Sequence, residues 1–144
     1  AGWRVGMLLG PSKLIEAVTK IKTNMDSGMF IPIQEGAIEA LNTGDTWYEE
    51  NNKVYAKRRE IAFQICDLMN FSYDKEQVGM FIWARIGDEI KEVANIVDKL
   101  LYEAGVFLTP GFIFGKNGDR YIRISLCSTE ESLMEAYNRI EGIL

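Results

Sequence analysis

An arginine near the end of the chain has the surroundings of an anion-binding residue. The segment Tyr121–Cys127 alternates apolar and polar side chains, which predicts a half-buried strand. Its apolar residues then share one face, and Arg123 lies on the opposite face between Tyr121 and Ser125. A guanidinium held on a rigid strand can bind a carboxylate through two parallel hydrogen bonds. The alternative is a solvated arginine on the wet face of an antiparallel sheet.

A second arginine, Arg4, lies near the start of the chain in another alternating segment. The pattern of Trp3–Leu9 predicts a strand with its apolar residues on one face and Arg4 on the other. Gly6 has no side chain, so a ligand could approach both the backbone and the guanidinium, which suits a phosphate group. An ordinary solvent-facing arginine is again the alternative.

Two glycine-containing segments could also contribute to a site. Pro110–Gly115 is an aromatic, turn-rich loop that could line a pocket or simply form a hairpin corner. Asn24–Gly28 is a polar loop that could approach a ligand, although most polar loops are only connections. Neither segment has the glycine-rich phosphate-binding pattern that ends in lysine and serine or threonine.

The residue types that the sequence lacks narrow the possible chemistry. There is no histidine, which excludes Ser-His-Asp and Cys-His nucleophile systems and removes the commonest metal ligand. Cys66 and Cys127 cannot supply a zinc site alone, and we expect both to be small buried hydrophobes in a reducing compartment. Any chemistry must use carboxylates, lysine, arginine, tyrosine or a bound organic cofactor. We assign no catalytic residue and no metal ligand.

The composition predicts a globular protein. Hydrophobic residues make up 47% of the chain and charged residues 26%, which argues against disorder. The net charge of -5 provides no basic surface for a phosphate backbone, so we expect no nucleic-acid partner. Apolar runs such as Val78–Ala84 are too short to span a bilayer, and we expect no membrane association and a cytoplasmic location.

The order of predicted elements indicates an α+β fold. Helices are predicted from Ser12 to about Lys22, from near Pro32 to just before Gly44, and from a capping box at Thr46 to about Asn70. From residue 72 the predicted elements are a strand at Val78–Ala84, a helix from Asp88, extended pieces at Val106–Leu108 and Phe112–Phe114, a strand at Tyr121–Cys127 and a helix from a capping box at Ser128. The long helix is expected to join two domains.

Both ends of the chain resemble one family. Ala1–Gly6 reads AGWRVG and resembles the segment that follows the Schiff-base lysine of class I and II pyridoxal-phosphate-dependent aminotransferases, of the aspartate aminotransferase-like type. Phe107–Gly115 and the segment after Gly118 resemble the C-terminal signature of that family, and Val78–Ala84 resembles its small-domain strand. The order and spacing of these motifs match along nearly the whole chain.

The resemblance implies a role for each arginine. Arg4 matches the arginine that binds the cofactor phosphate, and Arg123 matches the arginine that binds the substrate α-carboxylate. Arg120 is the only nearby competitor and lies before the strand. In this register the Schiff-base lysine lies before Ala1, so we expect the chain to be a C-terminal fragment that is inactive alone.

The resemblance also implies a fold and a function for the intact enzyme. Residues 1–44 would end the large cofactor-binding domain with its last strand and helices, residues 45–70 would form a long interdomain helix, and residues 71–144 would form the small domain of a fold-type I enzyme, an antiparallel or mixed sheet with helices on one face. The enzyme would be a cytoplasmic homodimer that transfers an amino group between an amino acid and a 2-oxo acid through pyridoxal 5′-phosphate. Its first residues and Asn24–Gly28 are most similar to bacterial aspartate- or alanine-type enzymes.

Two other functions fit parts of the pattern. A β-lyase or decarboxylase-like enzyme on the same scaffold would share the matched arginines. A regulatory domain that binds a small molecule would account for the strand-helix-strand-strand-helix order after residue 72. It would leave the strand at Trp3–Leu9 unexplained.

Overall fold

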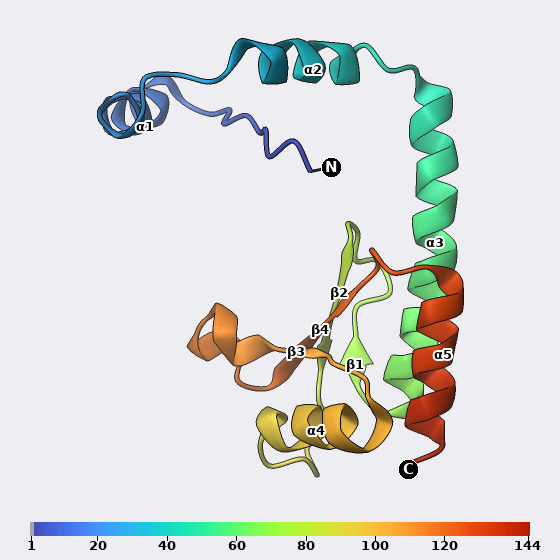
Figure 1. Ribbon diagram of the computed structural model, residues 1–144. Helices are drawn as coiled ribbons and strands as arrows, with labels where there is room; N and C mark the ends of the chain where they lie inside the picture. Colours follow the sequence, from blue (N-terminus) through green and yellow to red (C-terminus); the bar gives the residue numbers. More distant parts are fainter. Residues whose placement is uncertain (1) are drawn as a thin grey trace. The chain divides into compact units, whose positions relative to one another are not determined.

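The computed structural model describes residues 2–144. The chain divides into two units, which meet between Tyr48 and Glu49 in the sequence. Helix α3 (Asp45–Leu68) runs from the first unit into the second (Figure 1). It begins one residue before Thr46, the predicted capping residue, and ends close to the predicted position. Asn70 follows it in the left-handed conformation, with φ at 54°, which is a common way for a helix to end.

The first unit contains the helices α1 (Ser12–Met25) and α2 (Ile31–Leu41), and none of its described residues is buried. The carbonyl of Pro11 accepts the amide hydrogens of Leu14 and Ile15, so Ser12 is the first helical residue and not the predicted cap. Proline lies in the first turn of α2 as predicted, where its missing N–H is not needed.

The strand predicted over Trp3–Leu9 does not form in this chain. The backbone of residues 4–10 has no regular secondary structure. Every strand within residues 2–144 lies between Ser72 and Ser125 and pairs within that region. A strand is stable only when a neighbour accepts its hydrogen bonds, and no described segment supplies one here.

Four short strands form one antiparallel sheet in the second unit, in the order β1-β2-β4-β3 (Figure 1). They are β1 (Ser72–Tyr73), β2 (Phe81–Arg85), β3 (Thr109–Pro110) and β4 (Tyr121–Ser125). The central strands β2 and β4 pair along their whole length. β2 begins later than the predicted Val78, since Gly79, with φ at 92°, turns the chain just before it.

Two further helices complete the second unit: α4 (Val93–Lys99), which continues as a π-helical turn over Leu100–Ala104, and α5 (Glu130–Glu141). Gly105 ends the π-helical turn in the left-handed conformation, with φ at 65°. The hydroxyl of Thr129 caps α5 by accepting the amide hydrogen of Ser132 at 3.2 Å. The cap therefore lies one residue after the predicted one.

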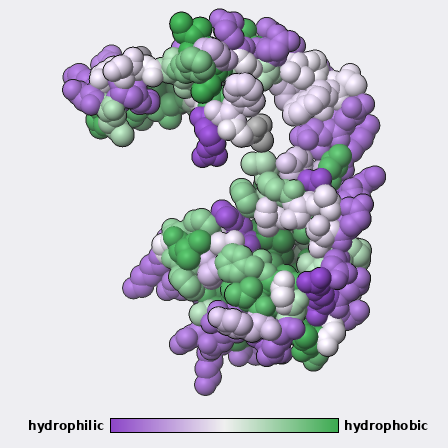
Figure 2. All heavy atoms as spheres, viewed as in Figure 1, coloured by the Kyte–Doolittle hydropathy of each residue, from purple (hydrophilic) through white to green (hydrophobic). Residues whose placement is uncertain are grey.

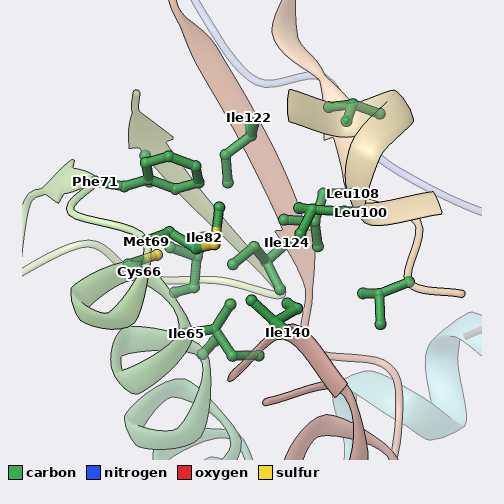
Figure 3. Close-up of a cluster of buried hydrophobic side chains, with 14 of the residues drawn as sticks. Ile65, Cys66, Met69, Phe71, Ile82, Leu100, Leu108, Ile122, Ile124 and Ile140 are labelled. Atoms are coloured by element: carbon green, nitrogen blue, oxygen red, sulfur yellow. The ribbon is translucent and has the colours of Figure 1, made fainter. Parts of the chain in front are cut away.

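One hydrophobic core holds the second unit together. Figure 3 shows Ile65 of α3 and Ile140 of α5 pointing toward Ile124 of the sheet. Buried residues of α3, α4, α5 and the sheet all belong to this cluster, so the three helices cover one face of the sheet. The fold is α+β, with a small antiparallel sheet and helices on one face, as predicted. The other face of the sheet does not contribute to this core.

Candidate functional site

The face of the sheet opposite the core carries Arg123 in the middle of β4. The predicted alternation is confirmed, because Ile122 and Ile124 are buried and Arg123 lies half-buried on the other side. Arg123 lies opposite Trp83 of β2 and opposite Thr109 of β3. With a strand on each side, the backbone that carries Arg123 is held rigidly.

The guanidinium of Arg123 contacts two aromatic rings. Its central carbon, Cζ, lies 4.2 Å from the centre of the Phe81 ring and 4.5 Å from the centre of the Phe114 ring. Both distances lie within the range of cation–π attraction. Within residues 2–144, its buried Nε has no hydrogen-bond partner and its guanidinium forms no ion pair. A cation with unused donors on a rigid strand is suited to binding a carboxylate.

Further aromatic side chains lie near the two rings that contact Arg123. The rings of Trp83 and Tyr121 stack with their centres 5.2 Å apart and their planes 10° from parallel. Trp83 also meets Phe114 edge to face, with ring centres 5.9 Å apart. β1 pairs only with Ala84 and Arg85 of β2. Next to them, the backbone N–H of Trp83 donates a hydrogen bond to the side-chain oxygen of Gln77 at 2.8 Å. These apolar surroundings strengthen any charge interaction made by Arg123.

The loop between β3 and β4 places Phe114 against Arg123. It consists of two 3₁₀ turns, Gly111–Phe114 and Lys116–Gly118, where the pattern predicted an extended piece at residues 112–114. A Cβ atom added to Gly111 would overlap the carbonyl oxygen of Gly118 and would lie 2.7 Å from that of Tyr121. Glycine is therefore required for the two ends of the loop to approach each other. The aromatic loop contributes a side chain to the site and is more than a hairpin corner.

Arg120, the other arginine in this segment, is engaged elsewhere. Its Nη2 donates to the carbonyl oxygen of Gly87 at 2.7 Å, and its Nη1 donates to that of Lys91 at 3.1 Å. The carboxylate of Asp88 lies 3.7 Å from its Nη2. Arg120 thus closes the loop before α4. Of the two arginines, Arg123 is the one whose guanidinium forms no ion pair within residues 2–144.

Asp88 has a different role from the predicted one. Its Oδ1 accepts a hydrogen bond from Nη2 of Arg85 at 2.6 Å, and this contact holds the pKa of Asp88 below its usual range. The ionised carboxylate therefore belongs to the turn after β2 and does not begin a helix. The helix predicted from Asp88 begins only at Val93.

Arg4 lies in the first unit, on an exposed segment. Its φ of 58° places it in the left-handed region, which residues other than glycine rarely adopt. The site that the resemblance implies there would bind a phosphate, and an exposed guanidinium has the donor chemistry for that group. No atom lies within 4 Å of a Cβ placed on Gly6, so the backbone beside Arg4 is accessible. Arg4 and Arg123 lie in different units.

Phe81 is a site residue that sequence reasoning missed. A strand was predicted at Val78–Ala84, but no local pattern showed that Phe81 shares a face of the sheet with Arg123. The cross-strand register of β2 and β4 determines that contact. A prediction of which strands pair would have been needed to find it.

The cysteines differ in their surroundings, although both are free. Burial raises the pKa of the Cys66 thiol to about 12. Cys127 is exposed, so the prediction that it is a buried hydrophobe was wrong. β4 ends at Ser125, and the chain has left the core by residue 127.

Residues 2–144 contain neither a membrane-spanning helix nor a cluster of metal-binding side chains. No helix in that range is both long and apolar enough to cross a membrane. In the same part of the chain, no group of three or more cysteine, aspartate and glutamate side chains is arranged to hold a metal ion.

Comparison with known proteins shows similarity to one family. Residues 1–140 match the family model described as Aminotransferase class I and II. The LL-diaminopimelate aminotransferase of Maridesulfovibrio salexigens is 39% identical over 142 residues, which cover 99% of this chain and 36% of that relative. The LL-diaminopimelate aminotransferase of Aquifex aeolicus is 34% identical over the same shares of both chains.

Solved structures show the same similarity. The crystal structure of an aromatic aminotransferase from Pyrococcus horikoshii OT3 superposes with a TM-score of 0.84 at 33% identity, over 99% of this chain and 39% of that one. An aminotransferase from Staphylococcus aureus superposes with a TM-score of 0.81 at 30% identity, over 99% of this chain and 38% of that one. The chain spans about a third of the length of the curated relatives it matches (36%).

Proposed function

The chain belongs to the class I and II aminotransferases, and on that basis we propose that the full-length protein containing it transfers an amino group from an amino acid to a 2-oxo acid. Aminotransferases of this family depend on pyridoxal 5′-phosphate. Membership of the family argues against the regulatory small-molecule-binding domain that the order of elements also allowed.

The open guanidinium of Arg123 is the observation that supports this proposal. It can donate two parallel hydrogen bonds to the α-carboxylate of an amino acid. That group is common to LL-diaminopimelate and to aromatic amino acids, for which two of the similar proteins are named. Holding the substrate at its carboxylate would restrict the orientation of its α-carbon, where the proton has to be removed.

Arg4 is assigned to the cofactor in this proposal. Its exposed guanidinium would bind the phosphate of pyridoxal 5′-phosphate through charge-assisted hydrogen bonds. When bound, the cofactor would supply an electron sink for the chemistry at the substrate α-carbon. Arg4 would hold the cofactor in place, whereas Arg123 would orient the substrate.

The proposal includes the architecture of the full-length protein. Residues 1–44 complete the large cofactor-binding domain, residues 45–70 form the helix between domains, and residues 71–144 form the small domain. The full-length protein is a cytoplasmic homodimer, as the family resemblance implies. Light scattering on the purified full-length protein tests the dimer, and a single mass equal to one chain would contradict it.

Two substitutions in the full-length protein test the two assignments. Arg123→Ala should weaken transition-state binding by about 2–4 kcal/mol, which lowers kcat/KM for the amino acid mainly through a higher KM. The cofactor absorbance should stay nearly unchanged. Arg4→Ala should show the reverse, with weak retention of the cofactor during dialysis. Arg139→Ala is the matched control, because Arg139 pairs with Glu135 on the surface of α5 and should alter neither property.

The outcomes separate the two roles. If Arg123→Ala mainly causes loss of cofactor, the assignment of Arg123 to the substrate fails. The 144-residue chain, assayed beside the full-length protein, should give no keto acid above the background of free cofactor. In the matched register, the lysine that binds the cofactor would precede Arg4, and the residues of this chain before Arg4 include no lysine. Turnover by the chain alone would show that the matched register is wrong.

A further inference from the structure

We propose that Phe81 and Phe114 are positioning residues that orient the guanidinium of Arg123 for the substrate carboxylate. This inference rests on the proposed function, in which Arg123 binds that carboxylate. It adds two side chains that act on the substrate through Arg123 and do not themselves bind the reacting atoms.

The two contacts come from two different segments that precede Arg123 in the chain. Phe81 begins β2, next to β4 in the sheet, and Phe114 ends the first 3₁₀ turn of the loop between β3 and β4. Both rings approach Cζ of Arg123, at 4.2 Å and 4.5 Å. The face of an aromatic ring attracts the guanidinium, whose plane is then restrained by the rings.

Neither ring is buried as a core residue would be. Phe81 is 37% exposed and Phe114 is 53% exposed, and neither belongs to the hydrophobic core of the second unit. Packing of the core therefore does not explain large aromatic side chains at both positions. Their contact with Arg123 does.

Orientation matters because of the geometry of the bond that Arg123 would form. A guanidinium binds a carboxylate best when two of its N–H groups lie in the plane of the carboxylate. A free arginine side chain has many rotamers, and ordering it on binding lowers the affinity. Cation–π contacts leave the N–H groups at the edge of the guanidinium available while they restrain its plane.

The loop that carries Phe114 is itself constrained. Gly111 and Gly118 approach so closely that a Cβ on either would overlap the backbone of the other. The ring of Trp83 supports Phe114 from the sheet, edge to face at 5.9 Å. Phe114 is thus held at its position by the backbone of the loop and by a neighbouring ring.

Steady-state kinetics of the full-length protein with pyridoxal 5′-phosphate test the inference. The amino donor in this assay is the one of four amino acids that gives the highest kcat/KM: L-glutamate, L-aspartate, L-phenylalanine or LL-diaminopimelate. Phe81→Leu and Phe114→Leu keep an apolar side chain but remove the ring. Each should raise KM and lower kcat/KM by about two- to fivefold, with kcat and cofactor absorbance nearly unchanged. Phe114→Tyr, which keeps the ring, should restore KM.

Two controls separate positioning from general damage. Phe112→Leu changes an exposed ring of the same loop that does not lie over Arg123, and it should leave KM unchanged. Phe114→Leu in an Arg123→Ala background should have no further effect, because a residue that acts through Arg123 cannot act without it.

The outcomes distinguish the role of Arg123 from the role of the two rings. If Arg123→Ala raises KM but neither leucine variant does, the inference is overturned and the proposed function stands. If Phe114→Leu lowers kcat/KM equally with and without Arg123, the ring acts independently, and the inference is again wrong. If Arg123→Ala leaves KM unchanged, the proposed role of Arg123 in binding the substrate fails, and the inference fails with it.

Discussion

Arg120 and Arg123 lie three positions apart in the sequence, yet their guanidinium groups make different contacts. Arg120 donates to backbone carbonyl oxygens of Gly87 and Lys91 and so holds a loop closed. Arg123 contacts two aromatic rings, and within residues 2–144 its guanidinium forms no ion pair. A cation whose donors are used inside the protein stabilises the fold, whereas one whose donors remain open can bind a ligand.

The face on which Arg123 lies was predictable, since strand alternation is local and the apolar residues of β4 define the core side. The engagement of Arg120 was not predictable from the sequence. Gly87 and Lys91 lie about thirty positions earlier in the chain, and only the tertiary fold brings them to Arg120.

The two thiols should react at very different rates. Burial raises the pKa of Cys66 to about 12, so this thiol stays protonated and unreactive in the folded protein, whereas Cys127 is exposed. Iodoacetamide at pH 8 should modify Cys127 in the native chain and Cys66 only after urea is added, as mass spectrometry of peptides would show. Cys127→Ser is the control and should abolish the native reaction.

The raised pKa of Cys66 also sets the sign of a pH effect. Between its ordinary pKa of 9.0 and about 12, the folded state holds the thiol proton that the unfolded state has lost. The contribution of Cys66 to stability is therefore present below pH 9 and lost as the pH rises above it. Rapid modification of Cys66 in the native chain would contradict both statements.

Among the elements of the second unit, the loop between β3 and β4 differs from its sequence prediction. An extended piece was predicted at residues 112–114, and the structure has a 3₁₀ turn there. Apolar aromatic residues favour strands when only local pattern is considered. The backbone contact between Gly111 and Gly118 closes the loop instead, and that contact is not visible in any periodic pattern.

Gly111→Ala should disrupt this loop. The added Cβ would lie 2.7 Å from the carbonyl oxygen of Tyr121 and 2.8 Å from the ring of Trp83, so the backbone has to move. We expect the free energy of unfolding to fall by about 1–3 kcal/mol, measured by urea denaturation followed by circular dichroism. The full-length protein should also show a raised KM, because Phe114 would leave Arg123.

A glycine with ordinary surroundings provides the control for this substitution. A Cβ on Gly142 would meet only the carbonyl oxygens of Arg139 and Asn138, both at 3.6 Å. Gly142→Ala should therefore change stability by much less than Gly111→Ala. Equal stability of both variants would show that the loop adapts easily and that its closure does not depend on glycine.

At the scale of the whole molecule, the two units differ in how they hide apolar surface. All residues of the hydrophobic core belong to the second unit. In the first unit, large apolar side chains remain more than half exposed, among them Trp3, Met7, Leu9, Phe30 and Leu41. Figure 2 shows apolar residues at the surface over α1 and α2. Exposed apolar surface of this extent tends to bind another protein surface.

The chain by itself should therefore self-associate. Light scattering over a dilution series should show a mass that rises with concentration. Hydrogen exchange should be fast in residues 2–44 at low concentration and slower where association occurs, and slow throughout in the buried strands and helices of the second unit. A monomer at every concentration, with residues 2–44 protected, would show that these residues pack within their own chain.

The sequence by itself determined what depends on near neighbours along the chain. It predicted the helices, the face of β4 that carries Arg123, and, through its motifs, membership of the aminotransferase family. Helical spacing and strand alternation are local, and a motif is read residue by residue. None of these requires knowledge of which distant segments meet.

The tertiary structure alone decided what depends on distant segments. It left Trp3–Leu9 without a partner strand, bound Arg120 to a loop, and set the rings of Phe81 and Phe114 against Arg123. Hydrogen-bond pairing and side-chain contact across a sheet are settled by the register of strands that lie far apart in sequence. That register is determined by which surfaces are buried together, and no local pattern contains it.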